Sequence, residues 1–320
     1  MHADLYTWDP MVAYWRGRWW LYSLGHERDD ASWHSQPFWT RGHGLYGFAS
    51  DDFKTWEPLG KVADAEPGTR LCAGAIAANG DELLAWLGCV EFAEGNWALD
   101  QSVRFYRSED GTTWGQRPRP FVPAPPSFSS GVFSANEPRR PYFGCRDMFV
   151  AEFGGTYYLY VPTGGKRWQA ETRVVVMQSD DLHGPWSEPT IAAGPIQWYG
   201  HEPLQEFERV SVVEQNGTYY MTGACWEGWV PPTHREQAAA IGEPITSYTM
   251  HLLTADNPLG PFQLKWDMPF IRNTGRTGQY GALLIESTGG LQALGWMHRA
   301  VRVDPSQTFD VDLETQCAHL

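Results

Sequence analysis

The feature that most constrains the fold of this chain is a short phrase that recurs along its whole length. A polar turn with a glycine is followed by aromatic or apolar residues that run into a β-strand, as in Gly17-Arg18-Trp19-Trp20 and Gly155-Thr156-Tyr157-Tyr158. The turn glycines are Gly17, Gly80, Gly155, Gly217 and Gly290, spaced 62 to 75 residues apart. Five repeats of this size indicate a repeat architecture in which each unit holds about four strands.

A second phrase follows the turn phrase in the first four repeats. A run rich in β-forming residues leads to an acidic turn and then to an aromatic residue, and these aromatics are Trp56, Trp114, Trp186 and Phe262. The pattern is typical of a third strand, a tight turn and a fourth strand. The sequence therefore predicts an all-β, five-bladed β-propeller with four antiparallel strands per blade. We expect residues 1–320 to form this one domain, with a single short helical turn at most, between Arg235 and Ile241.

The composition limits the kinds of binding partner that the protein can have. The formal net charge of −14 argues against nucleic acid and anionic membranes, which require basic surfaces, and favours a neutral ligand. The five cysteines have no CxxC spacing, so we expect reduced thiols and no zinc site, and no cofactor motif stands out. The first residues lack the features of a signal peptide and no stretch is long enough for a membrane span, so we expect a cytoplasmic protein. The sequence leaves the oligomeric state open.

Three carboxylates occupy comparable places in three repeats. The first residues of the innermost strand of each blade line the central pocket of a propeller. Asp9 and Asp147 lie eight residues before their turn glycines, and Glu208 lies nine before its own. The matching places in the second and fifth repeats hold Cys72 and a residue near Gly281 or Ala282. We therefore expect three of the five blades to direct a carboxylate into the same pocket.

Three carboxylates in one pocket suit the cleavage of a glycosidic bond. One must be protonated to assist the leaving oxygen and another must be ionised to attack or to activate water, while a third negative charge keeps their protonation states apart. Taken singly, Asp9-Pro10 reads as an ordinary turn and Arg146-Asp147 as a surface ion pair. Glu202 and Glu206 are alternatives to Glu208 as the acid. The shared spacing favours Asp9, Asp147 and Glu208 as a set.

These segments resemble the acidic motifs of a known group of enzymes. Trp8-Asp9-Pro10-Met11-Val12, Cys145-Arg146-Asp147-Met148-Phe149 and Phe207-Glu208-Arg209-Val210 are similar to the three motifs of the five-bladed propeller glycosidases of families 32 and 43. The resemblance covers essentially the whole chain. It implies that Asp9 is the nucleophile (family 32) or the general base (family 43), that Asp147 stabilises the transition state, and that Glu208 is the general acid.

The motifs point to family 32 in some places and to family 43 in others. Arg146-Asp147 and the segment from Tyr280 to Met297 resemble family 32, and the stretch from Gly25 through Trp33 to Trp56 resembles small bacterial family 32-like proteins. Asp9-Pro10-x-Val12 is closer to family 43. The preferred reading is a retaining, β-fructofuranosidase-like hydrolase acting on a furanosidic bond in an oligosaccharide or small glycoside. The alternatives are an inverting arabinofuranosidase or xylosidase of the family 43 type, and a carbohydrate-binding propeller without activity.

Other residues are candidates for holding the sugar. Trp8 and Trp226 can stack on a sugar face, His26 can bond a sugar hydroxyl, and Arg146 is placed in the site by its resemblance to the family 32 motif. Trp198 is a weaker candidate of the same kind. A structural role is the ordinary alternative for each of these residues, because most of the 17 tryptophans must pack between blades. His298 can hold a central ion or water, as in some family 43 enzymes, although a structural histidine is the simpler reading.

Overall fold

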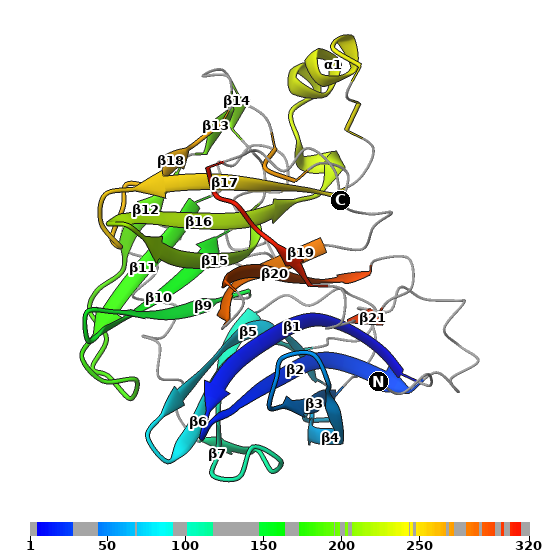
Figure 1. Cartoon of the computed structure of the whole chain (residues 1–320), viewed down its shortest axis with the longest axis vertical. Helices are drawn as coiled ribbons and strands as arrows, with labels where there is room; N and C mark the ends of the chain where they lie inside the picture. The colour runs from blue at the N-terminus through cyan, green and yellow to red at the C-terminus, as the bar shows by residue number, and fades with distance from the viewer. Residues whose placement is uncertain are drawn as a thin grey trace.

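The computed structural model shows a propeller of β-sheets. It describes residues 5–27, 44–67, 69–91, 101–117, 147–163, 173–194, 196–198, 202–203, 207–242, 244–245, 248–266, 269–271, 280–287, 290–297, 302–303 and 308–314. Within these ranges no helix is long and apolar enough to cross a membrane. The predicted all-β propeller is confirmed (Figure 1).

Four sheets are complete blades, each with four antiparallel strands that follow one another in space as they do in the chain. The strands of the first blade are β1 (Leu5–Trp15), β2 (Arg18–Glu27), β3 (Gly44–Ser50) and β4 (Glu57–Asp64). Those of the second are β5 (Thr69–Asn79), β6 (Glu82–Glu91), β7 (Gln101–Ser108) and β8 (Gly115–Arg117). The third consists of β9 (Phe149–Phe153), β10 (Thr156–Thr163), β11 (Arg173–Ser179) and β12 (Thr190–Ala193). The fourth consists of β15 (Glu208–Gln215), β16 (Thr218–Cys225), β17 (Thr249–Ala255) and β18 (Gln263–Leu264).

The last sheet departs from the predicted blade. Its long strands are β19 (Tyr280–Ser287) and β20 (Gly290–Met297), and its short ones are β21 (Arg302–Val303) and β22 (Phe309–Asp310). Both short strands pair with β20, at opposite ends, so among the described residues no fourth strand lies outside the third. We predicted five blades with the same order of four strands. Four sheets have this order, and the last sheet does not. Two residues in each short strand leave too few ladder hydrogen bonds to build a regular outer edge.

A hairpin and two short helices lie outside the blades in the described part of the chain. The hairpin of β13 (Gln197–Trp198) and β14 (Glu202–Pro203) joins the third blade to the fourth. The 3₁₀-helix η4 (Glu227–Trp229) and helix α1 (Pro232–Ala240) lie between β16 and β17, and α1 stands apart from the sheets (Figure 1). The prediction of one helical turn from Arg235 was wrong, because α1 begins at Pro232 and has nine residues. Proline is favoured in the first helical turn, and the alanines at its end are strong helix formers.

The local phrases of the sequence correspond to the hairpins of the structure. The turn glycines Gly17, Gly80, Gly155 and Gly217 lie between the first and second strands of the four blades, and Gly290 begins β20. In the acidic turns, a side-chain oxygen caps the backbone: Asp52 Oδ1 accepts from the N–H groups of Lys54 and Thr55 at 2.8 and 2.7 Å. Trp114 and Phe262 are buried directly before the fourth strands of their blades. Turn chemistry thus sets the predicted strand order within each blade.

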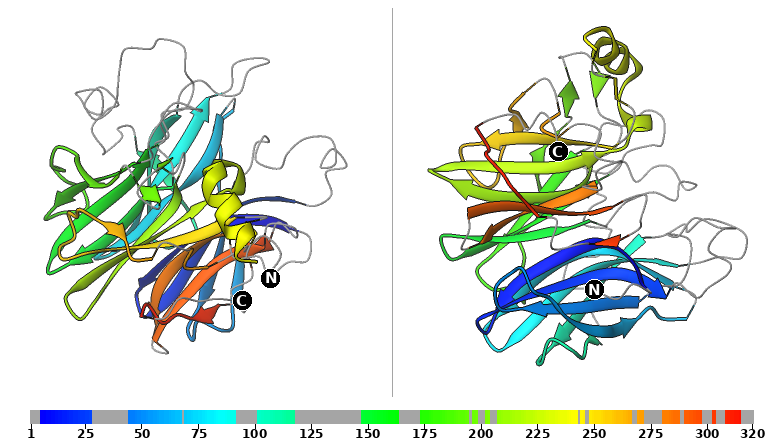
Figure 2. Two further views of the ribbon diagram at one scale, coloured as in Figure 1. Left: turned by 90° about the horizontal axis from the view of Figure 1, so that it is seen from above. Right: turned by 45° about the vertical axis from the view of Figure 1, so that its right-hand side comes forward.

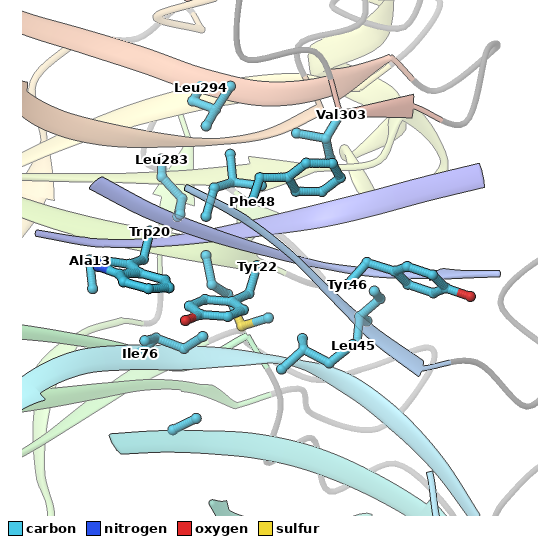
Figure 3. Close-up of a cluster of buried hydrophobic side chains, with 14 of the residues drawn as sticks. Ala13, Trp20, Tyr22, Leu45, Tyr46, Phe48, Ile76, Leu283, Leu294 and Val303 are labelled. Atoms are coloured by element: carbon cyan, nitrogen blue, oxygen red, sulfur yellow. The ribbon is translucent and has the colours of Figure 1, made fainter. Parts of the chain in front are cut away.

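The innermost strands pack side by side around the centre of the propeller. β1 contacts β5, β5 contacts β9, β9 contacts β15, β15 contacts β19, and β19 contacts β1, so the innermost strands close a ring (Figures 1 and 2). Polar bonds join neighbouring sheets, since the N–H of Val303 donates to Thr7 Oγ1 at 2.9 Å and that of Leu284 to Ser211 Oγ at 3.0 Å. The largest apolar cluster fills the space between the first, second and last sheets, where Tyr22, Ile76 and Leu283 meet (Figure 3).

Three of the five cysteines lie among the described residues. Cys89 and Cys225 are buried, and Cys72 is half-buried. Cys145 and Cys317 lie outside the described residues. Buried thiols of this kind pack as small apolar side chains.

We predict that stability falls below neutral pH because two histidines are buried. Burial lowers the pKa of His234 on α1 to about 4 and that of His251 on β17 to about 3, from an ordinary 6.5. Between pH 6.5 and 5 the unfolded chain therefore binds protons that the folded chain does not. Each histidine should lower the free energy of unfolding by about 1.4 kcal/mol per pH unit in that window.

Urea denaturation between pH 7.5 and 5 measures this slope. His234→Gln should reduce it by the contribution of one histidine, because glutamine does not titrate. An equal slope in His234→Gln and the parent protein would contradict the assignment.

Candidate active site

Three innermost strands carry the same irregularity close to their first residues. In β1, β15 and β19 two residues oppose a single residue of the neighbouring strand, which is a β-bulge. The bulges lie between Trp8 and Met11, between Glu208 and Ser211, and between Tyr280 and Leu283. A bulge interrupts the alternation of side chains across the sheet and re-aims them. Consecutive residues at these points can therefore face the centre of the propeller together.

A left-handed backbone marks the same place in four sheets. Asp9 (φ 54°), Asp147 (φ 58°), Arg209 (φ 53°) and Gly281 (φ 58°) all have positive φ, and we call this the left-handed position. For a residue other than glycine this conformation costs about 1–2 kcal/mol. Such strain persists only where the surroundings enforce it, and it collects at functional sites. The left-handed position also explains the spacing of Glu208, which lies one residue before it because Arg209 occupies it.

One buried phenol, Tyr280, is influenced by all three of the carboxylates singled out in the sequence. The hydroxyl of Tyr280 donates a hydrogen bond to Glu208 Oε2. Burial is the main cause that raises the pKa of Tyr280 well above its usual range, and the charge of Glu208 is the next. Asp147 and Asp9 lie close enough to add to the rise. Tyr280 is consequently a neutral hydrogen-bond donor near neutral pH.

Water has little access to these groups. Asp147 is 5% exposed, Glu208 is 8% exposed, and the side chain of Asp9 is 17% exposed. Asp147 is held from a neighbouring blade, since its N–H donates to the carbonyl oxygen of Ala73 on β5 at 2.8 Å. Phe207 fixes the start of β15 by packing its ring against Gly223 of β16, where a Cβ would lie 2.2 Å from the ring. Charges in so dry a site interact strongly.

The aromatic candidates have different surroundings. Trp8 is 3% exposed and packs in the core, with its ring edge-on to that of His26 at 5.9 Å between centroids. Trp226 is 40% exposed. It follows the end of β16, and because Ala224 pairs with Glu208, Trp226 leaves the sheet at the end where Glu208 lies. Trp226 thus offers a sugar far more open ring surface than Trp8 does.

Several candidates cannot be placed. Arg146, Glu206 and His298 lie outside the described residues, and so do the side chains of Trp198 and Glu202. Among the residues that the structure does describe, no group of three or more His, Cys, Asp or Glu side chains could hold a metal ion. The roles predicted for the carboxylates, for Trp8, His26 and Arg146, and for Trp226 stay predictions.

Sequence reasoning missed three residues of this site. Tyr280 and Arg209 were not predicted, and neither was Tyr248, whose ring lies 3.9 Å from that of Tyr280 between centroids. A signal for Tyr280 was present. It directly precedes the left-handed position of its sheet, as Glu208 does in β15 and Trp8 in β1. Reading two neighbouring residues in each repeat would have found it.

The arrangement has the parts that acid–base and nucleophilic chemistry require. Three carboxylates with restricted solvent access provide groups that can donate a proton, accept one or attack an electrophilic carbon. The neutral phenol of Tyr280 donates to Glu208, and the buried guanidinium of Arg209 lies beside Asp9. Among the described residues of the site, negative groups outnumber positive ones, which suits a neutral, hydroxyl-rich ligand better than an anion.

Comparison with known proteins places the fold among the glycosidase propellers. No protein-family model matches the sequence, and no curated protein does. The structure is similar to the family 32 β-fructofuranosidase of Bombyx mori, with a TM-score of 0.64 and 16% identity over 91% of this chain and 55% of that one. It is also similar to a thermostable family 43 glycoside hydrolase, with a TM-score of 0.60 and 15% identity over 95% of this chain and 88% of that one.

A third similar structure is the sucrose-6-phosphate hydrolase of Lactobacillus gasseri, with a TM-score of 0.64 and 15% identity over 92% of this chain and 56% of that one. The chain thus spans a little over half the length of the silkworm and Lactobacillus enzymes. At these identities the likeness establishes the fold. It confirms, at that level, the resemblance to the propeller enzymes of families 32 and 43.

We predict that Gly281→Ala destabilises the protein more than a matched glycine replacement. A Cβ at Gly281 would lie 2.8 Å from Cγ of Arg209, in addition to the cost of its positive φ. Gly80 has nearly the same φ, 56°, with nothing within 4 Å of an added Cβ. Gly80→Ala should therefore lose about 1–2 kcal/mol from strain alone, and Gly281→Ala about 1–3 kcal/mol more from the overpacked contact.

Denaturant unfolding of both variants gives the two losses. Equal losses would show that Gly281 is not needed to make room for Arg209.

Proposed function

We propose that this protein is a glycoside hydrolase that cleaves a furanosidic bond in an oligosaccharide or a small glycoside. In this proposal the last sheet acts as the fifth blade and closes the pocket. The observation that carries the proposal is the gathering of Asp9, Asp147 and Glu208 around Tyr280 at the centre of a propeller. A protein that only binds sugar has no need of three carboxylates that repel one another.

The similar structures favour a fructosyl substrate. A mutant of the silkworm enzyme is in complex with sucrose, and the inulosucrase of Halalkalicoccus jeotgali is bound to kestose. Both sugars contain a fructofuranosyl unit. We propose the same substrate class for this chain, with Trp226 as the open aromatic surface against which a sugar ring packs.

The proposed reaction divides the work among the three carboxylates. Asp9 forms a bond to the anomeric carbon while the bond from that carbon to the leaving oxygen breaks, and Glu208 gives its proton to that oxygen. In the second step Glu208 takes a proton from water, whose oxygen displaces Asp9 from the anomeric carbon. Asp147 holds the sugar through its hydroxyl groups and stabilises the positive charge that develops on the ring.

Tyr280 has a defined part in this scheme. Its hydroxyl donates to Oε2 of Glu208, which leaves Oε1 as the oxygen that carries the transferred proton. Because Tyr280 stays neutral, the bond persists in both protonation states of the acid. Orientation of a proton donor in this way is a large part of the gain from general acid catalysis.

A substrate panel is the first test of the proposal. Aryl furanosides and pyranosides, sucrose and fructo-oligosaccharides should separate into hydrolysed and untouched compounds, with the fructofuranosides hydrolysed. Hydrolysis of arabinofuranosides or xylosides alone would favour the family 43 type, to which Asp9-Pro10-x-Val12 is closer. Sugar binding without turnover of any compound would favour the binding propeller.

We expect Asp9→Asn, Asp147→Asn and Glu208→Gln each to lower kcat at least ~10²-fold, because each removes a positioned acid, base or charge. The folded state should persist, since each replacement keeps the shape of the side chain and relieves repulsion. Matched controls are Asp180→Asn and Glu286→Gln, which change the same residue types at exposed positions. A variant of the first group that keeps parental kcat would remove that residue from the mechanism.

We expect the first-formed sugar to retain its anomeric configuration. A covalent bond to Asp9 inverts the anomeric carbon once and its hydrolysis inverts it again. Proton NMR during the first turnovers identifies the anomer. An added alcohol should also appear as a glycoside, since it can replace water in the second step. An inverted anomer without alcohol product would make Asp9 a general base, as in the alternative of the family 43 type.

A further inference from the structure

The buried guanidinium of Arg209 has no part in the three-carboxylate scheme, although it lies at the centre of the site. We propose that Arg209 is a positioning residue that keeps Asp9 ionised and fixes the backbone on which Asp9 stands. This inference rests on the proposed function, and it assigns to that site a residue that acts through Asp9 rather than on the substrate.

Arg209 has the same left-handed backbone conformation as two of the carboxylate residues. Arg209, Asp9 and Asp147 all occupy the left-handed position, and each lies eight residues before the turn glycine of its own blade. An arginine gains nothing locally from this conformation, which disfavours any side chain. The side chain of Arg209 is only 2% exposed, so the groups that it contacts explain why an arginine stands at this position.

The side chain reaches from the fourth blade to the first. Nε of Arg209 lies 3.9 Å from Oδ1 of Asp9, and Nη2 donates a hydrogen bond to the carbonyl oxygen of Pro10. Gly281 of the last sheet leaves the room through which the side chain passes. The side chain of Arg209 thus contacts two consecutive residues of the β1 bulge. It pairs with the carboxylate of Asp9 and bonds to the backbone carbonyl of Pro10.

The charge at this point has a clear effect on Asp9. A buried carboxylate close to two others is pushed towards its protonated form, by desolvation and by like charge. A cation within about 4 Å acts in the opposite direction. Arg209 therefore favours the ionised form that a nucleophile or a base needs.

Other titratable groups lie on the elements that pack around Asp9. They are Asp147 before β9, Glu208 on β15 and Tyr280 on β19, with Tyr248 beside Tyr280, His26 on β2, and Arg70 and Cys72 near the start of β5, which packs against β1. Asp147 and Glu208 oppose the ionisation of Asp9, and Tyr280 is neutral. Arg209 acts in the opposite direction, through its ion pair with Asp9.

The test compares Arg209→Met and Arg209→Lys with the parent protein over a range of pH. Methionine keeps apolar length and removes the charge, whereas lysine keeps the charge without the planar fork of donors. In Arg209→Met the acidic limb of kcat/KM should move up by about one pH unit, and kcat should fall about 10-fold or more with a smaller change in KM. In Arg209→Lys the limb should stay within about 0.3 pH unit of the parent while kcat falls, because the bond to Pro10 is lost.

Arg16→Met is the matched control. Arg16 also has a positive φ, 52°, but it lies at the exposed turn between β1 and β2, where its ion pair is with Asp81. This variant should have the parental pH profile. A folded Arg209→Met with the parental acidic limb and kcat overturns the proposal, and so does an Arg209→Lys whose limb moves by a full pH unit. The lysine variant decides the matter if the methionine variant does not fold.

A second readout separates this inference from the proposed function. The titration of Asp9 can be followed by carboxyl ¹³C NMR, with its signal assigned by loss in Asp9→Asn. If the parent hydrolyses no glycoside, the proposed function fails, but a higher titration midpoint in an Arg209 variant still supports the coupling. Equal midpoints in the parent and in both Arg209 variants overturn it.

Discussion

The left-handed backbone at the start of the innermost strands is the constraint on which the candidate site depends. In a regular strand, neighbouring side chains point to opposite faces, so only every second residue could reach the centre. The bulges of β1 and β15 remove this limit and let consecutive residues turn inward. Asp9, Asp147 and Arg209 bear the conformational cost, which the rigid hairpins and the contacts between blades sustain.

The second requirement is a balance of charge in a dry place. Asp147 and Glu208 are nearly inaccessible to water, and the side chain of Asp9 is only slightly more exposed. The repulsion among the three carboxylates is therefore weakly screened. Arg209 offsets part of that repulsion from within the same ring of strands. Tyr280 adds a hydrogen bond without adding charge, because burial and the carboxylates prevent its ionisation. The site thus combines groups that would be unfavourable one by one.

Much of the fold could be predicted because its signals are local. Turn glycines, acidic turns and the aromatics that follow them determine hairpins over a few residues, and four blades have the predicted order. The last sheet could not be predicted, because its two short strands are placed by pairing with β20 and not by a turn phrase. Helix α1 was underestimated, since its buried face consists only of His234 and Ala238 and leaves no amphipathic pattern.

The site was harder to predict for a related reason. Counting back from a turn assumes that one residue per blade faces the centre, and that assumption finds Asp9 and Asp147. A bulge instead lets two neighbouring residues face the centre, and either of them can be the acid. In β15 the acid Glu208 comes first, and the cation Arg209 occupies the left-handed position. In β19 the same pair of positions holds a phenol and a glycine, and the missing side chain of Gly281 makes room for Arg209. Two positions per blade, filled differently, are enough to bring acids, a cation and a neutral donor to one centre.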